Sequence, residues 1–231
     1  MCTSIVSNIE KTVIGFNLDL LGMEHKIVCE DDKVYIAIWD ETEGWLPLFG
    51  ANSRGDFIAM PTCYPYDARS DAVTDGDVNI INLDIDLLLE KRTFDEARRL
   101  AGATHISSVP GVTFQAQLSD AAGNVLQITP GQGTRFTERP RYSVMTNFSP
   151  FKGKSEAHPW MGADRYDIAV GMLEKSEKFG VAECFDALKA ASQTVCPTVV
   201  SMVFTPEDRT VYWCLDRQYD KINKMTLERL K

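Results

Sequence analysis

The pattern of hydrophobic and polar positions predicts short strands first, helices in the middle of the chain and strands again towards its end. The runs that we interpret as strands are 3–7, 12–18, 33–39, 57–60, 112–118, 124–129, 142–146, 198–204 and 210–214. Residues 8–11 suit a hairpin turn, and 120–124 and 206–208 join later pairs. This order of elements is typical of an α+β protein rather than of a βαβ series.

Three further runs have the apolar spacing of helices: 82–102, 164–179 and 182–191. In the first, Thr93 and Glu96 have the spacing of a capping box. In the second, Asp164 is placed to cap the first turn. Gly102 and Gly180 are expected to end the first two helices.

Composition and charge narrow the class of protein. Of the 231 residues, 44% are hydrophobic and 25% are charged, and no Pro- or Gly-rich linker divides them, so we predict one domain over 1–231. The net charge of −9 argues against binding to nucleic acid or to an anionic membrane. No apolar run approaches about 18 residues and no signal peptide is visible, which predicts a soluble, cytoplasmic protein.

The six cysteines lack the spacing of a metal site. They form no CxxC pair, and only three histidines are available to join them. We therefore expect no metal and no cofactor. Most of the thiols should be free and buried as small hydrophobic groups.

Cys2 is the exception, because it directly follows the initiator methionine. Removal of Met1 would place a thiol and a free α-amine on the same residue. An α-amine has a pKa of about 7.7–8, so it is poised to accept the thiol proton near neutral pH. This is the arrangement of an N-terminal nucleophile. The alternative is that Cys2 is an ordinary residue of the first strand.

Three other polar residues lie at positions that suit chemistry. Asp19 ends the second predicted strand, and the hairpin would return its carboxylate towards Cys2. Asn147 follows the strand 142–146, where its amide is a candidate donor to an oxyanion. Arg165 lies in the first turn of a helix, where the helix dipole disfavours a cation that has no anionic partner. The alternatives are turn residues for Asp19 and Asn147, and a solvated surface residue for Arg165.

These residues occur in an order that resembles the linear amide C–N hydrolases. That family contains the choloylglycine hydrolases, among them bile salt hydrolases and penicillin V acylases, and is similar to the acid ceramidase group. The blocks that match its pattern are 2–6, 15–19, 50–55 (Gly-x-Asn-x-x-Gly), 115–127 (a hairpin around Asp-x-x-Gly), 146–147 and 162–166. The resemblance extends over about residues 2–215 and implies a four-layer αββα sandwich of two antiparallel sheets flanked by helices.

The resemblance also implies an activity. Cys2 would be the nucleophile, its α-amine the base and Asp19 the anchor of that amine. Asn147 would contribute to the oxyanion hole, and Arg165 would organise the site. The expected reaction is hydrolysis of a linear amide in a small N-acyl amide substrate, through a thioester on Cys2, by a protein that forms a homo-oligomer.

Two positions depart from the family pattern. Phe16 stands where relatives usually have arginine, which removes a thiolate-stabilising charge and would enlarge an apolar acyl pocket. Thr62 and Cys63 stand near the place where many relatives have asparagine, and Thr62 donates one hydrogen bond at most. With Asn17, these residues are our candidates for substrate binding. Two other functions stay open: acyl transfer to an amine, and a non-catalytic binding protein that keeps the fold.

Overall fold

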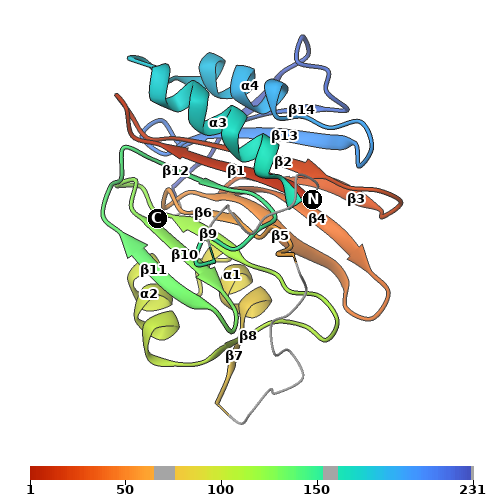
Figure 1. Cartoon of the computed structure of the whole chain (residues 1–231), viewed down its shortest axis with the longest axis vertical. Coiled ribbons are helices and arrows are strands. Elements are labelled where there is room, and N and C mark those ends of the chain that lie inside the picture. The colour runs from red at the N-terminus through yellow and green to blue at the C-terminus, as the bar shows by residue number, and fades with distance from the viewer. Residues whose placement is uncertain (65–75, 153–160, 230–231) are drawn as a thin grey trace.

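A computed structural model describes residues 1–64, 76–152 and 161–229 of the chain. Two antiparallel sheets face each other, and two helices cover the outer side of each sheet (Figure 1). One pair of helices is α1 (Ile80–Leu88) and α2 (Phe94–Ala103), and the other is α3 (Ala163–Lys175) and α4 (Val181–Ala190). The predicted αββα sandwich, of class α+β, is confirmed. No helix among the described residues is long and apolar enough to cross a bilayer.

The first sheet lies beneath α3 and α4 and contains the first and last strands of the chain (Figure 1). Its strands are, in spatial order, β12 (Tyr142–Met145), β1 (Cys2–Ser7), β2 (Val13–Asp19), β13 (Thr198–Thr205), β14 (Thr210–Leu215) and β15 (Asn223–Thr226). The hairpin predicted from residues 3–18 is formed by β1 and β2, with Cys2 opposite Leu18. The N-terminus of β1 therefore lies beside the end of β2.

The second sheet packs against α1 and α2. Its strands are, in spatial order, β11 (Gly133–Thr137), β10 (Val125–Thr129), β9 (Ala116–Ser119), β6 (Phe57–Ala59), β5 (Gly44–Asn52), β4 (Lys33–Asp40) and β3 (His25–Glu30). A short parallel pair joins β7 (Val78–Asn79) and β8 (Ile106–Ser107). Strands β3, β5, β11 and β15 were not predicted. The edge strands β3, β11 and β15 are largely exposed and lack the alternating hydrophobic pattern. The central strand β5 contains Pro47 and two glycines, which are more typical of a loop.

The side chains of β1 and β2 point alternately to the two faces of their sheet. Cys2, Phe16 and Leu18 belong to the core between the sheets. Ile5 and Val13 belong to a second core beneath α3 and α4. By this alternation the Cys2 thiol faces the opposite sheet, whereas the carboxylate that follows Leu18 faces the helices.

The single helix predicted over 82–102 is wrong, because α1 ends at Leu88 and α2 begins at Phe94. The predicted capping box is confirmed and starts α2: the Glu96 backbone N–H donates to Thr93 Oγ1, and Glu96 accepts from the Thr93 N–H. A capping residue has an extended backbone outside the helix, so the box itself requires a break before it. Gly102 lies inside α2 rather than after it.

The start predicted for the helix over 164–179 is also wrong. Gly162, not Asp164, is the N-cap of α3, and no side chain caps this end. The helix ends at Lys175, and Gly180 is the N-cap of α4 rather than the stop of α3. Gly162 adopts a φ of 85°, a left-handed conformation that favours glycine and sets the direction in which the helix leaves.

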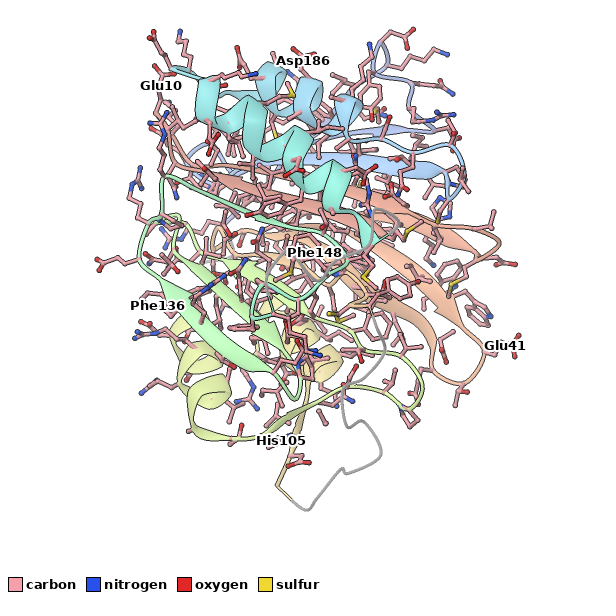
Figure 2. All side chains as sticks on the ribbon, viewed as in Figure 1. Glu10, Glu41, His105, Phe136, Phe148 and Asp186 are labelled. Carbon is pink, nitrogen blue, oxygen red and sulfur yellow. The ribbon has the colours of Figure 1, made fainter. Side chains whose placement is uncertain are left out.

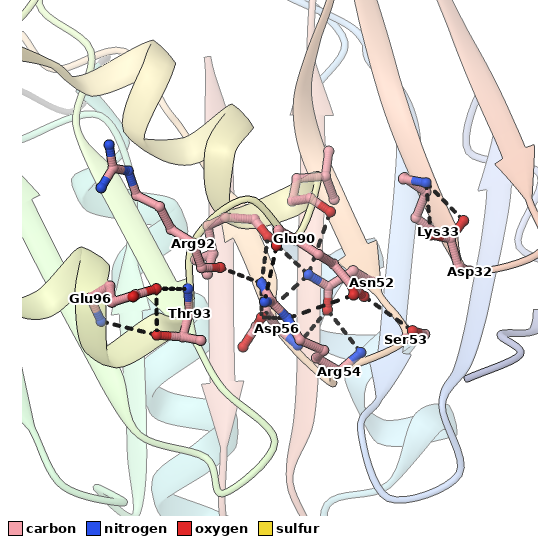
Figure 3. Close-up of polar contacts among 12 residues, drawn as sticks. Asp32, Lys33, Asn52, Ser53, Arg54, Asp56, Glu90, Arg92, Thr93 and Glu96 are labelled. Atoms are coloured by element: carbon pink, nitrogen blue, oxygen red, sulfur yellow. Dashed lines mark hydrogen bonds and ion pairs between the residues drawn. The ribbon is translucent and has the colours of Figure 1, made fainter. Parts of the chain in front are cut away.

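The Gly-x-Asn-x-x-Gly block at 50–55 stabilises the end of α1 (Figure 3). Asn52 Nδ2 donates to the carbonyl of Leu87 over 3.0 Å. Arg54 Nη2 donates to the Leu87 and Arg92 carbonyls. The last carbonyls of a helix lack partners within it, and a cation there is favoured by the helix dipole. The block therefore caps the C-terminal end of α1 with side-chain hydrogen bonds, and these contacts do not involve Cys2.

Candidate active site

The β1–β2 hairpin places Asp19 at the N-terminus of the chain. The Met1 amine donates to the Asp19 carbonyl over 2.6 Å, and the Asp19 N–H donates to the Met1 carbonyl over 2.8 Å. Cys2 follows directly and is buried, with 4% of its surface exposed. The register of the hairpin therefore brings Asp19 beside the residue that precedes Cys2, in the direction that the sequence predicted.

Arg165 is the centre of the polar cluster around Cys2. Its Nη1 donates to the Cys2 carbonyl, to Thr3 Oγ1 over 2.9 Å and to Asp19 Oδ2 over 3.3 Å. Its Nη2 donates to Asn147 Oδ1 over 2.8 Å. The alternative of a solvated surface residue is wrong, since only 2% of Arg165 is exposed. One guanidinium therefore joins β1, β2 and the segment after β12.

Asp19 is fully buried and has further partners from β13 and the loop before it. Thr198 Oγ1 donates to Asp19 Oδ1 over 2.6 Å, and Gln193 Nε2 donates to Oδ2. Burial raises the pKa of Asp19, whereas the Arg165 guanidinium and these two donors oppose the rise. Thr198 and Gln193 were not predicted from the sequence. They belong to no motif, and the pairing of β13 with β2 brings Thr198 opposite Asp19.

Asn147 holds the backbone nitrogen of Cys2. Its Oδ1 accepts from that nitrogen over 2.9 Å, in addition to the bond from Arg165. Its Nδ2 donates to the Thr62 carbonyl over 2.7 Å and to Thr62 Oγ1 over 3.1 Å. Both ends of the amide are therefore engaged in this structure, and the role of Asn147 as an oxyanion donor stays a prediction. The Thr62 hydroxyl accepts from Asn147 and keeps its own proton to donate.

The other substrate-binding candidates have their own partners outside the hydrogen-bonded cluster of Asp19, Asn147 and Arg165. Phe16 is completely buried, and its ring stacks on Phe49 with centroids 4.5 Å apart, so the residue is part of the core. The side chain of Asn17 lies on the helix side of β2, where Nδ2 donates to the Leu188 carbonyl over 2.7 Å. Cys63 is buried beside Thr62, with its backbone hydrogen-bonded to the neighbouring segment.

The thiol of Cys2 needs a base before it can react. Burial raises its pKa to about 11, although the N-terminal ammonium and Arg165 act in the opposite direction. At neutral pH the sulfur is therefore protonated and a weak nucleophile. The backbone nitrogen of the same residue is hydrogen-bonded to Asn147. Removal of Met1 would turn that nitrogen into a free amine.

Two antiparallel sheets that face each other between helical layers form the αββα sandwich of the Ntn-hydrolase fold. A conjugated bile acid hydrolase from Clostridium perfringens matches with a TM-score of 0.70 and 14% identity, over 98% of this chain and 92% of that chain. The Caenorhabditis elegans ortholog of N-acylethanolamine-hydrolyzing acid amidase matches at 0.62 and 17%, over 98% and 100%. Penicillin V acylase from Agrobacterium tumefaciens matches at 0.60 and 13%, over 98% and 91%.

No protein-family model matches the sequence, and no curated protein matches it in a sequence search. At the identities of these three structures, the likeness establishes the fold. The sequence resemblance, which rests on the order of short motifs and not on the fold, pointed to the same kinds of amide-hydrolysing enzyme.

Gly162 sets the position of Arg165, so Gly162→Ala is expected to destabilise the protein by about 1–3 kcal/mol. An added Cβ would lie 2.5 Å from Arg165 Nη2 and 3.0 Å from the Thr146 Cβ, at a φ of 85°. Urea unfolding measures the change. Gly171→Ala is the matched control in the same helix, where a Cβ meets nothing within 4 Å. It should stabilise by about 0.5–1 kcal/mol, and equal losses in both variants would contradict this account.

Proposed function

We propose that this protein hydrolyses linear amide C–N bonds, with Cys2 as an N-terminal nucleophile after removal of Met1. The observation that carries the proposal is the 2.9 Å hydrogen bond from the Cys2 nitrogen to Asn147 Oδ1, inside the cluster of Asp19 and Arg165. An ordinary strand residue does not require such a buried polar setting around its backbone nitrogen. The Ntn-hydrolase fold supports the same reading.

Acylation is the first half of the proposed reaction. The α-amine of Cys2 takes the thiol proton, and the sulfur attacks the carbonyl carbon of the substrate amide. A tetrahedral intermediate forms with a negative charge on the former carbonyl oxygen. When it collapses, the C–N bond breaks and the α-ammonium returns its proton to the leaving nitrogen. An amine departs, and the acyl group stays on Cys2 as a thioester.

Deacylation repeats these steps with water. The α-amine takes a proton from the attacking water, whose oxygen bonds to the thioester carbon. Collapse of this second intermediate breaks the C–S bond, and the sulfur recovers the proton. The product is a carboxylic acid, and the free thiol of Cys2 is restored.

The cluster tunes the amine for this task. Asn147 Oδ1 fixes the nitrogen, and the buried carboxylate of Asp19 favours its protonated form. The Arg165 guanidinium contacts the Cys2 carbonyl and disfavours a second positive charge beside it, which keeps the amine able to accept a proton. The Thr62 hydroxyl, with a proton free to donate, is our candidate donor to the oxyanion, together with Asn147 as predicted.

The substrate proposed here is a small N-acyl amide. The structural neighbours are named for conjugated bile acids, N-acylethanolamines and penicillin V. These compounds share an acyl group in amide linkage. We therefore assign an acyl group in amide linkage, and no particular acyl or amine group, to the substrate of this protein.

The test combines mass spectrometry with turnover. Intact mass should show that the active protein lacks Met1, and iodoacetamide should label Cys2 and abolish hydrolysis of a panel of N-acyl amides that release a chromogenic amine. Cys2→Ala should reduce turnover to background. Cys29→Ala, which removes an exposed thiol outside the cluster, should leave turnover unchanged. Full turnover by Cys2→Ala, or by protein that retains Met1, would refute the proposal.

A further inference from the structure

A cavity that we call the α4 groove lies on the outer face of the first sheet. It has a volume of about 780 Å³ and runs between α4 and the connection from β14 to β15. Its apolar and aromatic lining residues are Val181, Ala182, Phe185, Tyr212, Tyr219 and Ile222. The rings of Phe185 and Tyr219 meet edge to face, with centroids 6.4 Å apart. This size and lining are typical of small-molecule sites.

Charged residues surround this apolar floor. The cations are Lys189, Arg217 and Lys224, and the acids are Asp186 and Asp220. Asp186 lies on the outer side of α4, at the top of the molecule in Figure 2. None of the three cations pairs with a carboxylate of the residues that the structure describes. The rim is thus cationic by one charge on a chain whose net charge is −9.

The turn that presents Arg217 to the groove has an unfavourable backbone. Asp216 and Arg217 have φ values of 48° and 60°, and the Gln218 N–H donates to the Leu215 carbonyl over 2.8 Å. Turns with two positive φ values prefer asparagine, aspartate or glycine at the first position and glycine at the second. Asp216 suits its position, whereas keeping Arg217 where glycine is favoured costs stability, and such strain accumulates where a side chain has a function.

We propose that the α4 groove binds a small organic anion that has an apolar body. Its carboxylate or sulfonate would lie against Lys189, Arg217 and Lys224. Its apolar part would rest on Phe185, Tyr212 and Ile222. The three cations, which have no carboxylate partner among the described residues, select the anion, and the aromatic floor selects a flat or flexible hydrocarbon body over a free inorganic ion.

The groove is also linked to the cluster around Cys2. The Tyr219 hydroxyl is 3.0 Å from Ser201 Oγ, and Ser201 donates to Asn17 Oδ1 over 2.7 Å. Asn17 lies two positions before Asp19 on the same face of β2, and Gln193, in the loop after α4, donates to Asp19. We therefore expect a ligand in the groove to alter the surroundings of Asp19 through these contacts. This regulation of the Cys2 site rests on the proposed function.

The binding experiment uses the full chain and a pair of probes that differ in charge. Titration calorimetry should show that 4-phenylbutyrate binds, and that 4-phenylbutan-1-ol binds about threefold to tenfold more weakly or not at all. Arg217→Gly relieves the strained turn while it removes the cation, so it should fold normally and weaken 4-phenylbutyrate binding by a similar factor.

Arg139→Gly is the matched control. Arg139 also has a positive φ, of 35°, and is exposed, but it precedes β12 at the opposite edge of the sheet from β14 and β15. This variant should bind 4-phenylbutyrate like the native chain. Equal binding of the two probes, or equal weakening by both glycine variants, would overturn the proposed site.

The link to Asp19 has its own measurement, the rate at which iodoacetamide alkylates Cys2 in Met1-free protein. Saturating 4-phenylbutyrate should change this rate by about fivefold or more. Tyr219→Phe keeps the aromatic floor and removes the bond to Ser201, so it should bind the probe and lose the change in rate. An unchanged rate in the native chain would overturn the link. Absence of amide hydrolysis would overturn the proposed function and leave both of these readouts intact.

Discussion

Arg165→Met is expected to destabilise the protein by about 3–5 kcal/mol, because it leaves the carboxylate of Asp19 buried without its cation. Asp19 is completely inaccessible to solvent, and Arg165 Nη1 is the cation within 3.3 Å of it. Asn147 Oδ1 loses a donor at the same time. Methionine keeps the aliphatic stem of arginine but not the volume of its guanidinium, so the loss in the single variant contains both charge and packing. Urea unfolding at pH 7 measures the difference.

The double variant Arg165→Met/Asp19→Asn separates the charge from the other contacts. Removing both charges should recover part of the loss, since an unpaired buried charge costs more than an absent pair. The loss in the single variant should also shrink as the pH falls, because the carboxyl of Asp19 then becomes neutral. Arg141→Met is the control: Arg141 is exposed, and its change should stay within about 0.5 kcal/mol. A double variant no more stable than the single would contradict this account.

Asp84→Asn is expected to make the stability of the protein less sensitive to rising pH. Asp84 lies in α1, is completely buried, and neither carboxylate oxygen has a hydrogen-bond partner among the residues that the structure describes. Burial raises its pKa well above the ordinary value of 3.8. The folded state therefore holds this proton to a higher pH than the unfolded state does. Its contribution is complete below the unfolded pKa and is lost as the pH rises towards the folded pKa.

The measurement is the difference in unfolding free energy between Asp84→Asn and the native chain across pH. Asparagine keeps the shape of the side chain and cannot ionise. The advantage of the variant should grow by about 1.4 kcal/mol for each pH unit between the unfolded and folded pKa values of Asp84. Asp31→Asn, which removes an exposed negative charge, should differ from the native chain by less than about 0.5 kcal/mol. A constant difference between Asp84→Asn and the native chain would contradict the buried-acid assignment.

Local patterns in the sequence predicted a large part of the fold. The central strands other than β5 follow from alternating side chains that face either a core or the helices, and the capping box at Thr93 follows from short-range hydrogen bonds. These interactions involve residues close together in the chain. The helix predicted over 82–102 was wrong because a hydrophobic pattern does not show where the backbone turns between two helices packed on one sheet.

Of the candidate site, the sequence predicted the part that depends on contacts between neighbouring segments of the chain. The hairpin of β1 and β2 returns Asp19 towards Cys2 whatever the rest of the chain does. Asn17 illustrates the limit of such reasoning, because its side chain points to α4 and away from the face that holds the Cys2 thiol. The register of the hairpin determines that direction, and one residue's displacement would reverse it.

The sequence by itself determined the strand-rich α+β order, the cysteine behind the initiator methionine and the acid that a hairpin brings to it. The tertiary structure decided which residues surround them. Arg165 reaches Asp19 across 146 positions of sequence, and Thr198 reaches it across 179. Such contacts arise from the pairing of β13 with β2 and from the placement of α3 by Gly162. No local pattern encodes them, because the free energy that forms them comes from burying the two sheets and four helices together.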